Sequence, residues 1–398
     1  MASQLRLLIS ITLSTISLQA SLLKAQDDTA VVGFLSLDCG ASASSKDEHG
    51  ITWEPDGSFM AEGEAVEVGT HPSGILQLRS LRVFSGNASK YCYSLSNSLV
   101  RSKAFFLIRA SFWPGTAPPY KPQSADGNYR FKLLIDADEW TDVRVPNSGN
   151  ASTWQYREMY LRAQRSSIDV CVARSSPDGD APFISSLELR PLPSSLTPTD
   201  YMQSSGRVDA LYLEQYRAHF VPPTFDYTVT RYNLDLFDRM WLPTFIDSVE
   251  SITTNKSVAS STSANRPPER IVQSAFLSSS GIIIPLSGLV GRPYVVVLDF
   301  AEIDPNVTAS GQRTFNVEVN GVLSNRDGPI DVFARAGGAY DATSYTFYVQ
   351  PSSPDGDLFF NFSATANSRF APFVTAYEFF RENNVSSTTF SFQDDGES

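Results

Sequence analysis

The stretch Thr314-Phe315-Asn316-Val317-Glu318-Val319-Asn320-Gly321 decides the fold class of this chain. Phe315, Val317 and Val319 alternate with polar residues, which places them on one face of an extended strand, because successive strand side chains point to opposite faces. The Asn-Gly pair that follows is a strong signal for the tight turn of a β-hairpin. The stretch therefore predicts a half-buried strand that turns back on itself.

Similar patterns recur along the chain. Residues 168–172 alternate in the same way, and the runs 105–108, 131–135 and 294–298 are apolar enough for strands that are buried on both faces. The 23 Gly and 24 Pro residues are spread at short intervals, as turns between many strands require. A helix-like stretch at 208–220 has mixed periodicity and does not change the assignment. We predict an all-β chain.

The sequence also repeats itself. Ala181-Pro182-Phe183 precedes Leu187-Glu188-Leu189-Arg190, and 190 residues later Ala371-Pro372-Phe373 precedes Tyr377-Glu378-Phe379-Phe380-Arg381. The apolar runs that begin at 105 and 294 are 189 residues apart. Several matches in the same order predict two homologous β domains.

The N-terminus resembles a secretory signal. Arg6 precedes the uncharged, largely apolar stretch 7–18, the small residues Ala20 and Ala25 follow, and acidic residues come directly afterwards. No later window has the 18 or more uninterrupted apolar residues that a membrane span needs. The expected organisation is a signal peptide at 1–25, a first domain at 26–190, a Pro- and Ser-rich linker at 191–205, a second domain at 206–382 and a disordered polar tail at 383–398.

Composition excludes several classes of protein. The chain has 398 residues, of which 42% are hydrophobic and 19% charged, so it can form cores and is not a disordered chain. Its net charge of −12 argues against nucleic acid and anionic membranes as partners, because phosphate binding needs clustered Lys and Arg. The 12% of aromatic residues suits strands and surfaces that contact sugars or peptides.

Glycosylation sequons agree with secretion. Six Asn-x-Ser/Thr sites occur, at Asn87, Asn150, Asn255, Asn306, Asn361 and Asn384. Asn361 alternates with Leu358, Phe360 and Phe362, so we expect it on the solvent side of a strand.

The three cysteines are too few for a disulfide scaffold. A disulfide between Cys39 and Cys92, which would leave Cys171 as a free thiol, is one interpretation. Three buried free thiols are the other.

Signatures of enzymes are missing from the sequence. The histidines His49, His71 and His219 form no metal-spaced pair and are expected in loops or at the surface. The sequence has no nucleophile elbow, Walker A loop or dinucleotide fingerprint. Asp136, Asp138 and Glu139 suit either an acid/base pair or calcium, but a solvated turn before a core Trp140 explains them equally well. The two Ser-Pro-Asp-Gly-Asp stretches, 176–180 and 353–357, are likewise more typical of turns than of calcium sites. We expect no enzyme activity, no cofactor and no metal.

The candidate ligand site lies in the Gly- and Pro-rich segment 112–129, which is not expected to form a regular strand. Trp113, Tyr120 and Tyr129 are its aromatic residues, and Asp126 lies between them. Aromatic faces stack on sugar rings, and a carboxylate accepts hydrogen bonds from hydroxyls. The alternative is that these aromatic residues cover one end of a sandwich or the seam between the domains.

Taken together, these motifs resemble a known family. The first half carries Leu37-Asp38-Cys39-Gly40, Lys90-Tyr91-Cys92-Tyr93 and Cys171, and the second half carries Phe237-Asp238-Arg239-Met240-Trp241, Asp299-Phe300-Ala301-Glu302-Ile303 and Ala376-Tyr377-Glu378. Their order and spacing over residues 34–381 resemble the malectin-like domain, the tandem extracellular module of plant receptor-like kinases. The resemblance implies two tandem malectin-type β-sandwich (jelly-roll-like) domains, a fold shared with a diglucose-binding lectin. Asp238 and Arg239 are expected to form a structural ion pair or turn.

The function expected from this resemblance is that of a secreted, glycosylated protein that binds carbohydrate in the cell wall or apoplast. The alternative is an ectodomain that binds a signalling peptide or a receptor protein and acts with a membrane receptor kinase. Relatives usually continue into leucine-rich repeats or into a membrane helix and a kinase, and this chain reaches Ser398 without either. We therefore expect a chain that binds a ligand without itself transmitting a signal.

Overall fold

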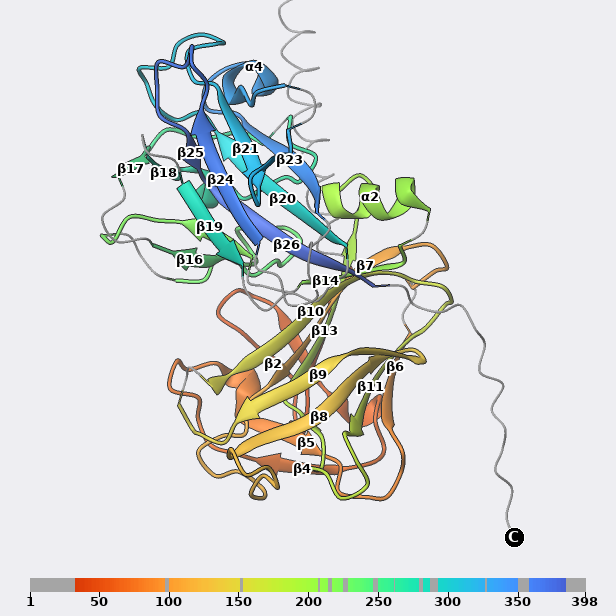
Figure 1. Cartoon of the computed structure of the whole chain (residues 1–398). Coiled ribbons are helices and arrows are strands. Elements are labelled where there is room, and N and C mark those ends of the chain that lie inside the picture. The colour runs from red at the N-terminus through yellow and green to blue at the C-terminus, as the bar shows by residue number, and fades with distance from the viewer. Residues whose placement is uncertain are drawn as a thin grey trace, which may run out of the picture.

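The computed structural model describes residues 33–96, 100–150, 153–206, 208–213, 217–224, 228–245, 250–260, 262–278, 282–286, 293–325, 328–349 and 358–383 (Figure 1). The expected signal peptide, the tail beyond Asn383, the sequon Asn384 and the second Ser-Pro-Asp-Gly-Asp stretch lie outside these residues. Across the described ranges, the helices are too short or too polar to cross a membrane.

The first lobe contains strands β1 to β13 and forms the lower half of Figure 1. Its strands are β1 (Leu35–Asp38), β2 (Ser45–Lys46), β3 (Thr52–Pro55), β4 (Glu64–Glu67), β5 (Ser80–Val83), β6 (Tyr91–Leu95), β7 (Phe105–Phe112), β8 (Asn128–Ile135), β9 (Asp138–Pro146), β10 (Gln155–Arg162), β11 (Ile168–Arg174), β12 (Phe183–Ile184) and β13 (Ser186–Leu192). The sheets β6-β11-β8-β9 and β12-β5-β4 lie opposite the strands of a larger sheet, which include β10, β7, β13 and β1.

The second lobe contains strands β14 to β26 and forms the upper half of Figure 1. Its strands are β14 (Ala210–Leu213), β15 (Ala218–Phe220), β16 (Leu242–Thr244), β17 (Glu250–Thr253), β18 (Ser274–Leu277), β19 (Ile282–Leu286), β20 (Tyr294–Ala301), β21 (Phe315–Val319), β22 (Val322–Leu323), β23 (Ala342–Val349), β24 (Leu358–Ala364), β25 (Phe373–Val374) and β26 (Ala376–Asn383). The sheets β19-β24-β21-β22 and β17-β18-β25 repeat the strand orders of the first lobe.

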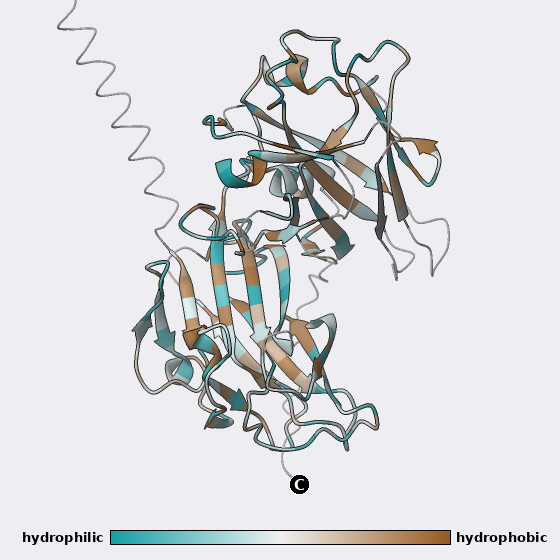
Figure 2. Ribbon diagram, turned by 90° about the vertical axis from the view of Figure 1, so that its left-hand side faces the viewer, coloured by the Kyte–Doolittle hydropathy of each residue, from teal (hydrophilic) through white to brown (hydrophobic). Residues whose placement is uncertain are grey.

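The strand and turn predicted for residues 314–321 are confirmed. Phe315, Val317 and Val319 are buried, whereas Asn316 and Glu318 are half-buried, and β21 turns into β22 at Asn320-Gly321. Asn320 and Gly321 both have positive φ, which the turn requires. Figure 2 shows the same alternation as brown and teal bands along strands of the lower lobe.

The segment 191–205, which the sequence analysis expects to be a linker, contains regular secondary structure. β13 continues to Leu192, and helix α2 (Thr197–Ser205) ends at Gly206, which has left-handed φ. Two short helices, α3 (Glu269–Val272) and α4 (Val332–Ala336), lie in the second lobe. The described residues of the stretch 208–220 include the strands β14 and β15.

One sheet runs through both lobes. β14 pairs antiparallel with β10 of the first lobe on one side and with β26 of the second lobe on the other. Each lobe has a hydrophobic core of its own, and a third cluster at the junction includes Leu107, Tyr160, Leu211 and Phe380. The lobes are therefore joined by backbone hydrogen bonds and apolar packing as well as by covalent continuity.

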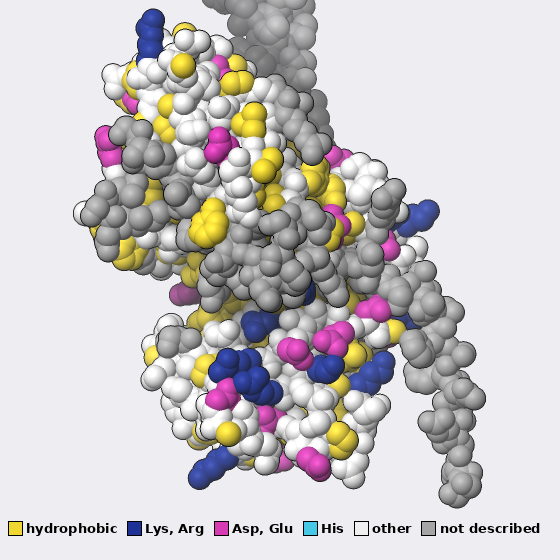
Figure 3. All heavy atoms as spheres, in the orientation of Figure 1, with side chains coloured by type: hydrophobic (Ala, Val, Ile, Leu, Met, Phe, Trp, Pro, Cys, Tyr) yellow, Lys and Arg dark blue, Asp and Glu magenta, His cyan; other side chains and the backbone are white. Residues whose placement is uncertain are grey.

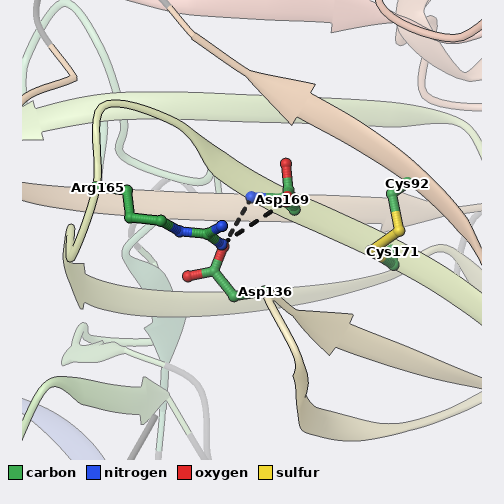
Figure 4. Close-up of a disulfide and its surroundings, with 5 residues drawn as sticks. All are labelled: Cys92, Asp136, Arg165, Asp169 and Cys171. Carbon is green, nitrogen blue, oxygen red and sulfur yellow. Dashed lines mark hydrogen bonds and ion pairs between the residues drawn. A yellow bond between two sulfur atoms is a disulfide. The ribbon is translucent and has the colours of Figure 1, made fainter. Parts of the chain in front are cut away.

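The disulfide joins Cys92 to Cys171, so both interpretations of the cysteines, a pair of Cys39 with Cys92 and three free thiols, are wrong (Figure 4). The two half-cystines lie directly opposite each other on β6 and β11, although 79 residues separate them in sequence. Cys39 is a buried free thiol, and burial raises its pKa well above the ordinary value. The pairing depends on the strand register, which the spacing of cysteines does not reveal.

Candidate functional site

The loop predicted to bind a ligand closes one end of the first lobe. Trp113 follows β7 and has no solvent exposure. Its Nε1 donates to the carbonyl oxygen of Asn150 at 3.2 Å, and its ring meets that of His71 edge-on at 4.8 Å. The burial of Trp113 favours the alternative that this residue covers one end of the sandwich over direct contact with a ligand.

Tyr129 is also fully buried, which favours the same alternative for it. Its Oη donates to the carbonyl oxygen of Tyr120 at 2.6 Å, and its ring packs edge-on against that of Tyr120 at 5.1 Å. Tyr120 is half-buried, and its hydroxyl donates to the carbonyl oxygen of Ala181. These contacts bring three predicted aromatic residues to one end of the lobe and use their polar atoms to hold the loop in place.

Asp126 is the most exposed of the predicted site residues. Its carboxylate accepts hydrogen bonds from Arg130 Nη2 at 2.6 Å and Arg144 Nη2 at 2.8 Å. Hydrogen bonds from Ser124 and Arg130 hold the pKa of Asp126 below its usual range. Figure 3 shows basic and acidic side chains beside one another on this face of the lower lobe. A ligand-binding role for Tyr120 and Asp126 stays a prediction.

The acidic cluster after β8 is a hairpin turn. Asp136 has positive φ, and its Oδ1 accepts hydrogen bonds from Arg165 Nη2 and from the backbone N–H of Asp169, both at 3.0 Å (Figure 4). Burial raises the pKa of Asp136. Glu139 accepts a hydrogen bond from Lys132 at 2.7 Å. Across the described ranges, no three His, Cys, Asp or Glu side chains are arranged to hold a metal ion.

Two of the histidines are buried, contrary to expectation. His71 is 2% exposed and lies against Trp113, and His219 of β15 is fully buried. Burial lowers the pKa of His219 to about 4, so the ring is neutral near pH 7. His49 is half-buried.

The sequons in the described residues lie near the surface. Asn87, Asn150, Asn255 and Asn306 are exposed. Asn361 is half-buried between the buried Phe360 and Phe362, as the alternation predicts.

A buried ionic network fills the boundary between the lobes. We call it the boundary network; its members are Arg109, Glu158, Glu188, Arg190, Arg217, Arg231, Asp235, Asp238, Arg239 and Glu378. Glu158 of β10 receives Arg109 Nη2 at 2.9 Å and Arg217 Nη2 at 2.8 Å, and Arg217 Nε donates to Glu378 of β26 at 2.5 Å. Arg190 and Arg231 both bind Asp238.

The network is structural because its side chains are closed to solvent or nearly so. Burial opposes ionisation of Asp238, yet Arg231, Arg190 and Arg109 hold its pKa well below the ordinary value. Asp238 and Arg239 are both structural, as expected, but they bind different partners: Arg239 Nε donates to Asp235 at 2.8 Å. The motif 237–241 thus supplies charges that lock the two lobes together.

An open groove lies in the second lobe, at a place that the sequence analysis did not identify. It has a volume of about 1070 Å³, and residues of the β21–β22 hairpin, of α4 and of β23 line it. We call it the β22–β23 groove; its lining comprises Val319, Asn320, Val322–Asn325, Gly328, Pro329, Asp331, Ala334, Arg335 and Tyr345–Val349. Among the described strands, β22 pairs only with β21, and β23 pairs only with β20. The groove is therefore lined by two strands whose second edges pair with no other described strand.

The walls of the groove carry exposed apolar side chains. Val322 is 67% exposed, Leu323 is 54% exposed and Tyr348 is 64% exposed. The ring of Tyr201 in α2 lies 4.9 Å from the ring of Tyr348, so the two tyrosines form an aromatic pair beside β23. Exposed apolar residues that gather along a groove are typical of a binding surface.

The polar groups of the groove are held in place. Asp331 caps α4 by accepting from the backbone N–H of Ala334 at 2.9 Å, and its other oxygen accepts from that of Gly311 at 2.7 Å. The guanidinium of Arg335 lies 4.4 Å from the centre of the Tyr345 ring. Burial raises the pKa of Tyr345 to about 12, so its hydroxyl stays protonated. Arg335 offers a cation at the rim, and the groove presents apolar contact together with a few oriented polar groups.

A family model and several known proteins are similar to this chain. The family model described as "Malectin-like domain" matches residues 37–382. A probable LRR receptor-like serine/threonine-protein kinase of Arabidopsis thaliana is 28% identical over 365 residues, which are 87% of this chain and 36% of the kinase. A second probable LRR receptor-like protein kinase of that plant is 27% identical over 372 residues, 90% of this chain and 38% of the relative. The chain thus spans well under half the length of these curated relatives.

Solved structures share the fold. The ANX2 ectodomain of Arabidopsis thaliana superposes with a TM-score of 0.68 and 15% identity, over 88% of this chain and 97% of that one. A structure of the plant peptide RALF23 in complex with FER and LLG2 superposes with a TM-score of 0.66 and 16% identity, over 88% of this chain and 96% of that one. These similarities show an ectodomain-type fold in which β-sheet dominates.

Proposed function

The chain belongs to the malectin-like family, and from this membership we propose that it is a non-enzymatic extracellular ectodomain module that binds a peptide ligand. We infer further that its two lobes are tandem copies of one malectin-type β-sandwich, because their strand orders repeat. The observation that carries the peptide proposal is the β22–β23 groove, whose lining combines exposed apolar side chains with two strand edges that pair with no other described strand. An extended peptide can form main-chain hydrogen bonds with the free N–H and C=O groups of such an edge.

The extracellular location rests on separate observations. The disulfide between Cys92 and Cys171 favours an oxidising compartment. Asn87, Asn150, Asn255 and Asn306 are exposed, as acceptors of N-linked glycans must be. The similarity to receptor ectodomains, one of them crystallised with a peptide, supports the same location and a peptide as ligand class.

Carbohydrate is the second candidate ligand, and the paired rings of Tyr201 and Tyr348 favour it. An exposed tyrosine face stacks on the apolar face of a sugar ring, and Arg335 and Thr346 nearby offer hydrogen bonds. Tyr120 and Asp126, which are partly exposed in the first lobe, form a second candidate surface for carbohydrate. Burial of Trp113 and Tyr129 removes the larger stacking surfaces that the sequence predicts for that loop.

Screening both ligand classes in parallel tests the proposal. The glycosylated protein is screened against a display library of random 12-residue peptides and against an array of cell-wall oligosaccharides. We expect enriched peptides whose affinity falls at least tenfold when Val322→Asp places a charge in the apolar wall of the groove. Val322 is 67% exposed, so this change should leave the melting temperature unaltered.

The control is Leu76→Asp, which places the same charge at an exposed apolar residue of the first lobe. It should leave peptide binding unchanged. Glycan binding with no peptide enriched would replace the proposed ligand class with carbohydrate. An unchanged peptide affinity in the Val322→Asp variant would show that the peptide binds outside the groove.

A further inference from the structure

The two lobes can be matched residue by residue along their central strands. Phe106, Ile108, Ala110 and Phe112 of β7 belong to the core of the first lobe, and Tyr294, Val296, Leu298 and Phe300 of β20 belong to the core of the second. Matching core-facing residues equates Phe106 with Tyr294, a shift of 188 residues (294 minus 106). The shift of 189 from the sequence alone would place core residues on the wrong face, because strand side chains alternate.

The match extends to the neighbouring strands. Phe106 pairs with Leu161 of β10, and Tyr294 pairs with Val349 of β23. Residues 159–161 therefore correspond to residues 347–349, and Tyr160 corresponds to Tyr348. Met159 and Leu161 face the first core just as Phe347 and Val349 face the second, which supports this register.

The equivalent strand edges have different surroundings. In the first lobe, β14 covers the outer edge of β10 by pairing with Met159, Tyr160 and Leu161. Across the described strands, none pairs with the matching edge of β23, where the β22–β23 groove opens instead. Tyr160 is accordingly fully buried, whereas its counterpart Tyr348 is 64% exposed.

Backbone groups of β23 point toward this open edge. The N–H of Ala342 donates to the carbonyl oxygen of Ala259 at 2.7 Å, and the carbonyl oxygen of Ala342 accepts from Thr262 Oγ1 at 2.9 Å. Both contacts lie on the side away from β20. The direction of the backbone N–H and C=O groups alternates from residue to residue along a strand, so the backbone groups of Thr346 and Tyr348 also point away from β20. In the first lobe, the N–H of Arg162 donates to the carbonyl oxygen of Asp209, just before β14. By the same alternation, the backbone groups of Tyr160 also point toward β14.

We propose that an extended peptide adds to β23 as an antiparallel strand opposite residues 347–349, in the position that β14 takes on β10. This inference rests on the proposed peptide-binding function, and it specifies where the peptide binds and in which conformation. β14 indicates the side chains required: Ala210 and Tyr212 enter the first core, and Leu211 packs at the junction. The ligand thus alternates apolar residues that enter the groove with residues that lie beside Tyr348. The net charge of −12 favours a cationic peptide during encounter.

The chain's own β14 sequence provides a probe. A fluorescent peptide of residues 208–214 (Val-Asp-Ala-Leu-Tyr-Leu-Glu) is titrated with the whole protein, next to the peptides from the display library. Leu211 lies opposite Tyr160, whose backbone groups face β14, so its N–H faces β10. N-methylation at Leu211 removes that donor, whereas N-methylation at Tyr212 removes a donor on the opposite edge and serves as the control.

A matched pair of protein variants tests the other side of the interface. Tyr348→Pro removes the outward N–H, and proline is tolerated at a strand edge where the N–H does not serve the ladder. Tyr348→Ala loses the same ring but keeps the N–H. We expect the proline variant to bind the probe and the library peptides at least tenfold more weakly than the alanine variant, with melting temperatures that agree. We also expect N-methylation at Leu211 to weaken binding at least tenfold more than N-methylation at Tyr212.

Equal binding by the two Tyr348 variants would overturn strand addition while leaving the proposed peptide-binding function intact. Equal effects of the two N-methylated peptides would overturn the proposed register. A wild-type protein that binds neither the probe nor any library peptide would overturn both the inference and the proposed function.

Discussion

Arg217 and Glu158 connect the two lobes through an ion pair whose Nη2–Oε1 distance is 2.8 Å and in which neither side chain is exposed. The same guanidinium donates to Glu378, so one cation serves a carboxylate on each side of the boundary. Burial would raise the pKa of Glu378, but Arg217 and Arg239 hold it below the ordinary value. The lobes are therefore linked by charges that cannot be separated without exposing or neutralising them.

Replacing Arg217 should destabilise the whole protein. Arg217→Met leaves Glu158 and Glu378 with one buried cation fewer, and removing one partner of a buried pair costs about 3–5 kcal/mol. The free energy of unfolding from denaturant titration measures the loss. Arg144→Met is the control, because the Arg144–Asp126 pair is exposed and such pairs contribute about 0–1 kcal/mol. Equal losses in the two variants would contradict a special role for the boundary network.

Reduction should weaken the first lobe through one disulfide. Replacing both Cys92 and Cys171 with alanine removes a cross-link that closes a long loop in the unfolded chain, at a cost of about 2–4 kcal/mol. The double variant should melt at the same temperature with and without reductant, whereas the wild type should melt lower when reduced. A Cys39→Ala variant should keep the reductant sensitivity of the wild type. Loss of that sensitivity in Cys39→Ala would restore the pairing expected from the sequence.

Local patterns of apolar residues, either alternating or in unbroken runs, were sufficient to predict several of the strands. The stretch 315–319 and the run 294–298 appear where expected, and the repeat of Ala-Pro-Phe motifs marks strands β12 and β25 in equivalent sheets. The 191–205 segment could not be predicted as largely ordered from its Pro and Ser content. Its helix contacts β14, which follows it closely, and also β10 and β20, which are distant in sequence.

The boundary network could not be predicted from the sequence because its members are charged residues. Glu158, Arg217 and Glu378 would each be assigned to the surface, because burying one alone is costly. Only the pairing of β14 with both β10 and β26 brings them together. The β22–β23 groove was missed for a related reason: Val322 and Leu323 suggest core residues, and their exposure depends on which sheet edges remain unpaired. The exposed Asn-Gly turn before them was the available signal.

Asp299 should lower the stability of the folded protein as the pH rises from about 4 to about 7. Burial raises the pKa of Asp299 to about 7, with Glu378 adding to the effect, whereas the unfolded value is about 3.8. Between these values the folded chain holds a proton that the unfolded chain has released, so stability is lost with rising pH. Asp38, whose pKa burial also raises to about 7, contributes with the same sign.

Asp299→Asn isolates this contribution. The amide can accept from Asn265 Nδ2 and donate to Ser344 Oγ, the two partners of the carboxylate. Unfolding free energies at pH 4 and pH 7 should show the variant gaining stability relative to the wild type by up to about 4 kcal/mol, at about 1.4 kcal/mol per pKa unit. Asp200→Asn, at an exposed residue of α2, is the control. A constant difference between Asp299→Asn and wild type across this range would show that Asp299 is ionised throughout.

Trp113 should prove to be a structural residue. Trp113→Ala removes a fully buried indole that packs on His71 and donates to Asn150, so we expect a loss of about 3–5 kcal/mol in the free energy of unfolding. Tyr120→Phe removes only a hydroxyl at a half-buried residue and should cost about 1 kcal/mol. Denaturant titration measures both, and the peptide and oligosaccharide screens are repeated on each variant. A Trp113→Ala protein of wild-type stability that no longer binds an oligosaccharide would return the ligand site to the first-lobe loop, because it would show that the loop opens and that the indole contacts the sugar.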